Sequence, residues 1–238
     1  LLAIYERSRD WSHAASIAQK MHAADQGDFS TRQAHYLCEQ ALALSVQGDR
    51  AGAKALLEQA IAAAPDAARA RIELARLQQL MGQPDAVLAT LQTLGERAPA
   101  ALPLAAPLLV EAGNATGRQA EVHARLVAHY EQSPSLDVLE SIVAMEAAND
   151  ATQATARVRY VQHLDKERSL VAAAKWLSAE KLEHEEFHPQ IQRALEHAVK
   201  PLTRYRCAAC GFEARQHFWQ CPGCQTWDSY PARRVEEL

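Results

Sequence analysis

One fixed spacing recurs along the chain and limits its fold more than any other feature of the sequence. Gly48 and Gly82 are 34 residues apart, and Pro65 and Pro99 are also 34 residues apart. Between each glycine and the next proline the same frame of small or apolar residues recurs at intervals of four and three: Ala53, Leu57 and Ala60 in one copy, and Val87, Leu91 and Leu94 in the next. Residues at these intervals share one face of a helix. The pattern predicts a helix that begins after the glycine turn and ends before the proline.

Three further copies carry the frame: one between Gly117 and Pro134 that is shifted by a single extra residue, an earlier and weaker one, and a later one. Their frame residues are Val122, Leu126 and His129 in the shifted copy, Ala14, Ala18 and Met21 in the earlier one, and Ala154, Val158 and Val161 in the later one. A single helix pair cannot bury its apolar face, so neighbouring pairs must stack. We therefore expect an all-α, right-handed solenoid over residues 1–200. An ordinary helical bundle is the alternative, but it has no reason to keep a fixed period.

The period and the glycine-to-proline interval resemble the tetratricopeptide repeat, a helix–turn–helix unit of about 34 residues. The chain departs from that family at Leu44 and Gln78, where tyrosine is common. Composition agrees with closely packed helices, because aromatic residues make up only 6% of the chain and alanine is abundant. The net charge of −4 gives no indication of nucleic-acid binding.

Four of the five cysteines form two Cys-x-x-Cys pairs near the C-terminus: Cys207 with Cys210, and Cys221 with Cys224. Each pair predicts a tight turn that directs two sulfurs to one point, and Gly211 permits the positive φ that such a turn needs. Four thiolates form the tetrahedral set that suits one zinc or one iron ion. Two redox-active dithiols are the alternative, which this paired spacing disfavours. The fifth cysteine, Cys38, is expected to be a small core thiol.

The cysteine segment, residues 201–238, is too short to fold by apolar burial alone, so metal binding should stabilise it. We expect it to form a small rubredoxin-like knuckle that packs on the last repeats. Its aromatic residues should form the apolar skin of the knuckle: Tyr205, Phe212, Phe218, Trp219, Trp227 and Tyr230. Four thiolates leave no open coordination position, which favours a structural metal over a catalytic one.

One short motif offers an enzymatic alternative. His184 and His188 fit the zinc-protease pattern His-Glu-x-x-His, in which both histidines lie on one helical face. Pro189 biases His188 away from helical geometry, and no third ligand is evident. A metal-dependent redox or hydrolytic protein that uses these histidines or the cysteines is therefore kept as the second hypothesis, behind a non-enzymatic binding protein.

Partner binding is expected on the concave groove that stacked helix pairs form. The repeat phase places five polar residues of first helices on that groove: His35, Ser45, Arg69, Arg76 and Gln79. No apolar run in the sequence reaches the length of a membrane span, which needs roughly 18 residues or more. The chain opens inside a repeat and without Met, so we expect it to be a fragment of a longer protein.

Helical repeats followed by Tyr-Arg-Cys-x-x-Cys-Gly-Phe and Trp-x-Cys-Pro-x-Cys-x-x-Trp resemble the lipopolysaccharide assembly protein B family of Gram-negative bacteria, sharpest over residues 204–227. The resemblance implies repeats on the cytoplasmic face of the inner membrane, a membrane helix that has no counterpart in this sequence, and a rubredoxin-like domain. It also implies an adaptor, not an enzyme, that promotes degradation of the LpxC deacetylase by the FtsH protease. The family's metal ligands carry over onto Cys207, Cys210, Cys221 and Cys224. The RadA recombination ATPases carry a similar knuckle, but theirs comes first and leads into a nucleotide-binding domain, and this chain has no phosphate-binding loop.

Overall fold

The computed structural model describes residues 1–149, 151–153, 155–178, 180 and 185–238. These residues form two compact units, 1–117 and 118–238. The boundary that the sequence predicts at residue 200 separates repeats from knuckle and stays a prediction. No helix in the described part of the chain is long and apolar enough to cross a membrane.

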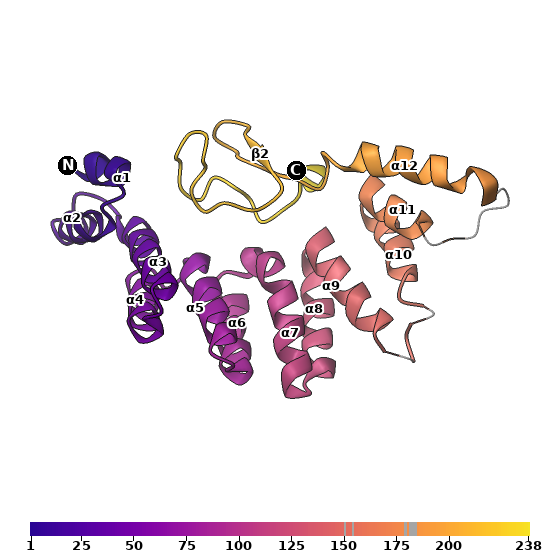
Figure 1. Cartoon of the computed structure of the whole chain (residues 1–238), viewed down its shortest axis with the longest axis horizontal. Coiled ribbons are helices and arrows are strands. Elements are labelled where there is room, and N and C mark those ends of the chain that lie inside the picture. The colour runs from indigo at the N-terminus through magenta and orange to yellow at the C-terminus, as the bar shows by residue number, and fades with distance from the viewer. Residues whose placement is uncertain (150, 154, 179, 181–184) are drawn as a thin grey trace. The chain divides into compact units, whose positions relative to one another are not determined.

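The first unit is a series of helix hairpins, in which α3 packs on α4 and α5 on α6 (Figure 1). Its elements are α1 (Leu2–Ser8), α2 (Trp11–Ala23), α3 (Ser30–Val46), α4 (Arg50–Ala63), α5 (Ala68–Leu80), α6 (Pro84–Arg97), the 3₁₀ helix η1 (Pro99–Ala105) and α7 (Ala106–Thr116). The residues of the recurring frame line the contacts within and between hairpins: Ala53, Leu57, Ala60, Val87, Leu91 and Leu94 are all buried. The predicted tetratricopeptide-repeat fold is thereby confirmed for these copies.

The turns between paired helices use glycine where the backbone requires it. Gly48 and Gly82 adopt φ values of 90° and 68°, a region in which a Cβ atom would be strained. After the first turn, the Asp49 side chain accepts a hydrogen bond from the Gly52 N–H at 2.8 Å and caps α4. The second helices end just before Pro65 and Pro99, as the sequence predicts.

The second unit combines helices with the cysteine segment. Its elements are α8 (Gln119–Gln132), α9 (Leu136–Ala147), α10 (Val158–Lys166), α11 (Leu170–Leu177), the 3₁₀ helix η2 (Glu185–Phe187), α12 (His188–Val199), β1 (Tyr205–Arg206), β2 (Glu213–Ala214) and the 3₁₀ helix η3 (Val235–Glu237). A carboxylate joins its first three helices: Glu146 of α9 lies 2.8 Å from His123 Nε2 of α8 and 2.7 Å from Arg159 Nη2 of α10. An all-α chain with a small C-terminal knuckle, as expected, is confirmed.

The frame predicted for the later copy is wrong by two positions. Val158 and Val161 are exposed at 46% and 37% of their surface, and Ala154 lies outside the described residues. The buried set is Ala156, Tyr160 and His163, which keeps the same intervals of four and three. Hydropathy alone predicts that Val158 and Val161 are buried. Tyr160 and His163 are buried instead, because a hydrogen bond in the core offsets the cost of burying the more polar set. Tyr130 OH lies 2.6 Å from His163 Nδ1, so neither polar atom loses its partner on burial.

Candidate metal centre

The first cysteine turn grows out of a two-stranded antiparallel ribbon. Strands β1 and β2 pair with Tyr205 opposite Ala214, and Cys207 follows β1 directly. The Gly211 N–H donates to the Cys207 carbonyl at 2.9 Å, which closes the turn around the first pair of sulfurs. Gly211 has a φ of 77°, so the positive φ expected from the sequence is confirmed.

The second cysteine turn repeats this geometry with a different residue. The Gln225 N–H donates to the Cys221 carbonyl at 2.8 Å, and the Cys221 N–H donates to the Thr226 carbonyl at 2.9 Å. Gln225 therefore occupies the place that Gly211 takes in the first turn, with a φ of 61°. The sequence did not reveal this left-handed residue, because glutamine carries no signal for positive φ. The spacing from Cys221 was the available clue.

The four sulfurs meet at one point. Cys207 Sγ lies 3.8 Å from Cys224 Sγ, and Cys210 Sγ lies 3.7 Å from Cys221 Sγ. All four lie within 4.8 Å of one another. A tetrahedral zinc ion with Zn–S bonds of about 2.3 Å holds its sulfurs about 3.8 Å apart. The four cysteines thus form a rubredoxin-like site for one metal ion, and both zinc and iron suit this ligand set.

The pKa shifts of the cysteine thiols also favour a cation at the centre of the cluster. Burial raises the pKa of the Cys207 thiol, but hydrogen bonds from Ser229 and from the backbone N–H groups of Cys210 and Ala209 outweigh it and lower the pKa to about 6. At Cys210, the Phe212 N–H lowers the pKa, yet desolvation and the other three cysteines raise it to about 12. The sulfurs therefore resist carrying four negative charges together. A divalent ion at their centre removes that repulsion and deprotonates the remaining thiols.

The site is half covered. Cys207 and Cys221 are buried, whereas Cys210 and Cys224 lie at the surface. Of the expected aromatic skin, Tyr205 and Tyr230 are buried, Phe218, Trp219 and Trp227 are half-buried, and Phe212 is exposed. An unforeseen member lies among them: the His217 ring meets the Trp219 ring edge-on at 4.7 Å, and its Nε2 lies 3.0 Å from the Tyr230 carbonyl oxygen.

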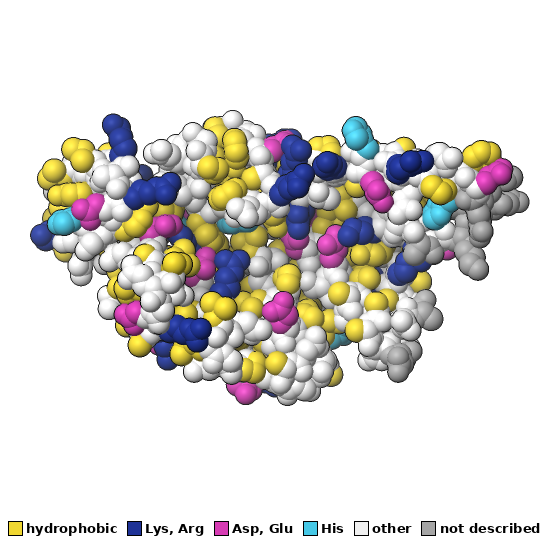
Figure 2. Space-filling view, in the orientation of Figure 1, with side chains coloured by type: hydrophobic (Ala, Val, Ile, Leu, Met, Phe, Trp, Pro, Cys, Tyr) yellow, Lys and Arg dark blue, Asp and Glu magenta, His cyan; other side chains and the backbone are white. Residues whose placement is uncertain are grey.

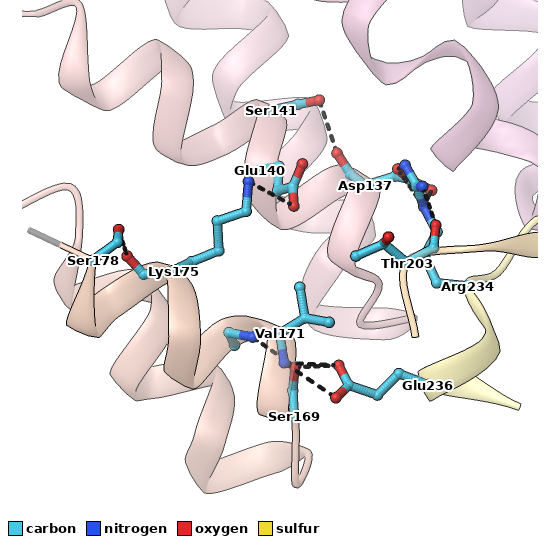
Figure 3. Close-up of polar contacts among 11 residues, drawn as sticks. Asp137, Glu140, Ser141, Ser169, Val171, Lys175, Ser178, Thr203, Arg234 and Glu236 are labelled. Atoms are coloured by element: carbon cyan, nitrogen blue, oxygen red, sulfur yellow. Dashed lines mark hydrogen bonds and ion pairs between the residues drawn. The ribbon is translucent and has the colours of Figure 1, made fainter. Parts of the chain in front are cut away.

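The knuckle attaches to α9 by polar contacts. The Arg234 guanidinium binds the Asp137 carboxylate with Nε 3.1 Å from Oδ1 (Figure 3). Tyr205 OH donates to Oδ2 of the same carboxylate at 2.9 Å. Arg234 also stacks over the Tyr205 ring, 4.6 Å from its centroid. Burial and the nearby Asp137 carboxylate raise the pKa of Tyr205, which keeps the phenol a hydrogen-bond donor. These contacts join segments far apart in the chain, and no pattern in the sequence signals them.

Two glutamates near the C-terminus, Glu236 and Glu237, cap the N-termini of α11 and α9. Glu237 Oε1 accepts a hydrogen bond from the Leu136 N–H at 2.8 Å, at the first turn of α9. Glu236 Oε1 accepts from the Leu170 N–H at 2.6 Å, and its Oε2 accepts from Ser169 Oγ at 2.6 Å, at the start of α11. Carboxylates suit these positions because unsatisfied N–H groups and the positive end of the helix dipole face them. Burial raises the pKa of Glu237, against the effect of the two backbone N–H groups of Arg234 and Leu136.

The residues proposed for partner binding lie in different surroundings. His35 and Arg69 are buried, at 2% and 4% exposure, and Arg69 Nη2 lies 2.6 Å from Glu39 Oε1. Ser45 and Gln79 are half-buried, whereas Arg76 is exposed. Figure 2 shows charged and apolar side chains interspersed over the face of the molecule that is seen in Figure 1. A role of these five residues in partner binding stays a prediction.

The histidine pair of the enzymatic alternative is described only in part. His184 lies outside the described residues, and His188 begins α12 with its Nε2 3.3 Å from the Leu177 carbonyl oxygen. Within the described ranges, the four cysteines form the one group of three or more metal-ligating side chains. Cys38, the remaining cysteine, is buried in α3 as a core residue.

Comparison with known proteins finds similar proteins for both the repeats and the metal centre. Residues 205–230 match the model described as the rubredoxin metal binding domain, and residues 47–112 match that of the tetratricopeptide repeat. Over its whole length the chain is 25% identical to the lipopolysaccharide assembly protein B of Escherichia coli strains K12, O6:H1 and O157:H7. It spans 62% of the length of these curated relatives. The chain is therefore similar to lipopolysaccharide assembly protein B in both its repeats and its metal centre.

Proposed function

We propose that the chain is the repeat and rubredoxin-like part of a non-enzymatic regulator of lipopolysaccharide biosynthesis. In this role it brings the LpxC deacetylase to the FtsH protease on the cytoplasmic face of the inner membrane and so promotes LpxC degradation. The 25% identity to lipopolysaccharide assembly protein B over the whole chain is the observation that carries this proposal. The regulator acts by binding, and its repeats supply the binding surface.

The chemistry of the metal centre supports binding over catalysis. A single ion held by four thiolates has no position left for water or substrate. The ion's role is then to fold a segment that is too small to fold by apolar burial. The packing of the knuckle on α9 and α11 places this stabilised segment against the repeats of the second unit.

A co-purification experiment tests the proposal. The chain carries an affinity tag at its N-terminus, because its C-terminal glutamates are bound to helices. We expect it to retain LpxC and FtsH from a detergent extract, and purified LpxC on its own. Retention of neither protein by folded, metal-loaded chain would refute the adaptor.

Three single variants test the predicted groove: two changes on α5 and a control on α4. Arg76→Ala removes an exposed cation of α5 that pairs with Glu73, and Gln79→Ala removes a half-buried amide of the same helix. Lys54→Ala removes a cation of α4 that pairs with Glu58 in the same way. The α5 changes should weaken LpxC or FtsH retention, and the α4 change should not. If the α5 variants and the α4 variant retain these proteins equally well, the groove assignment is refuted. The proposed adaptor function would be unaffected by that result.

A further inference from the structure

The two ends of the metal-binding segment converge on one carboxylate of the repeats. Tyr205 lies just before the first metal ligand and donates to Asp137. Arg234 follows soon after Tyr230, whose hydroxyl is 3.9 Å from Cys221 Sγ, and it binds Asp137 as well. Asp137 therefore contacts the chain both where it enters the metal site and where it leaves it.

The exit segment is held in place by its backbone as well. The Val235 N–H donates to the Arg204 carbonyl at 2.7 Å, and the Glu236 N–H donates to the Leu202 carbonyl at 3.2 Å. These bonds pair the segment after the metal site with the segment before it. The glutamates that cap α9 and α11 follow at once, so their positions depend on the same pairing.

We propose that Asp137 is a positioning residue that couples metal binding in the knuckle to the capping of α9 and α11. With the four sulfurs gathered round an ion, residues 205 and 234 are held at the spacing at which both reach the Asp137 carboxylate. Without the ion, the cysteine turns lose the constraint that sets this spacing, and the glutamates leave the helix N-termini. The coupling is reciprocal: contacts that favour the metal-bound arrangement must also tighten the metal.

Zinc affinity measured against a competing chelator tests the coupling from one side. Asp137→Asn keeps the shape of the side chain but removes the charge that holds Arg234. Its matched control is Glu140→Gln on the same helix, which loses a carboxylate whose ion-pair partner, Lys175 at 3.5 Å, lies on α11 (Figure 3). We expect Asp137→Asn to weaken zinc binding about tenfold and Glu140→Gln to change it far less. Equal zinc affinities of the two variants would overturn the proposal.

Amide hydrogen exchange of the unmodified chain tests it from the other side and does not depend on a variant that folds. Removal of zinc should speed exchange at Leu136, Leu170 and Val171, whose N–H groups the glutamates hold. The Gly52 N–H, held by Asp49 at the start of α4 in the first unit, is the internal control and should keep its rate. Unchanged exchange at all three amides after zinc removal would show that the metal site and the helix caps are independent.

Discussion

The buried hydrogen bond between Tyr130 and His163 lends itself to a quantitative prediction. Tyr130 OH lies 2.6 Å from His163 Nδ1, and the two side chains are 6% and 2% exposed. Tyr130→Phe deletes the hydroxyl but keeps the ring, including its position under the Lys166 ammonium 5.0 Å away. The change therefore leaves one buried polar atom, His163 Nδ1, without its hydrogen-bond partner. An orphaned buried polar atom costs about 1–3 kcal/mol, so the free energy of unfolding of the second unit should fall by that amount.

Urea unfolding measures this loss, with tryptophan fluorescence as the probe. Three of the four tryptophans, Trp176, Trp219 and Trp227, belong to the second unit, so their signal reports mainly on it. Far-ultraviolet circular dichroism follows the helices of both units in the same titration. A change of less than about 0.5 kcal/mol on Tyr130→Phe would refute the reasoning, because that is the range of an ordinary surface substitution.

A second substitution distinguishes the cost of an unsatisfied buried polar atom from the cost of lost packing. In the double variant Tyr130→Phe/His163→Leu both partners are apolar, and no buried polar atom of this pair is left without its partner. Replacement of both partners costs less than removal of one. The double variant should therefore unfold at a higher urea concentration than Tyr130→Phe alone. A double variant that is less stable by the sum of both single effects would show that the hydrogen bond contributes nothing.

Three further outcomes follow from the structure. Burial lowers the pKa of His163, so its neutral form contributes stability above about pH 6.5. That contribution is lost as the pH falls through the lower pKa of the folded state. The difference in urea midpoint between wild type and His163→Gln should therefore shrink when the pH is lowered from 7.5 to 5.5. Cys221→Ser should abolish stoichiometric metal binding in elemental analysis and broaden the amide signals of the knuckle, whereas Cys38→Ala, a change in α3, should leave the metal in place. Gly82→Ala places a Cβ atom on a residue with a φ of 68° and should lower the free energy of unfolding of the first unit by about 1–2 kcal/mol, as read from urea unfolding followed by circular dichroism.

Local patterns carried most of what the sequence could predict. Gly48 and Gly82 marked the hairpin turns because their conformation needs a residue without Cβ, and the cysteine spacing marked the metal centre because a tight turn aims two sulfurs at once. Both signals lie close in sequence to the feature that they predict. The later copy shows where this breaks down: periodicity allowed two frames, and only the hydrogen bond from Tyr130 selects the frame with His163.

Contacts between distant segments could not be read from the sequence. The sequence around Asp137 does not indicate that its partner is Arg234, 97 positions away. In the sequence, Arg234, Glu236 and Glu237 resemble an ordinary charged terminus. Their roles follow from geometry that only the folded chain provides. Gln225 was missed for a different reason: its left-handed backbone is imposed by the cysteine turn around it, against the preference of its own side chain.

The capping of α9 and α11 by the final residues also fixes an order of events during synthesis. Leu136 and Leu170 leave the ribosome long before Glu236 and Glu237 are made, so both helices first exist with only their serine caps, Ser135 and Ser169. The second unit is complete only when both glutamates have been added. A premature stop that removes Glu236 and all that follows it would delete both glutamate caps and leave every metal ligand in place. The shortened protein would then be less stable and more readily degraded by cellular proteases.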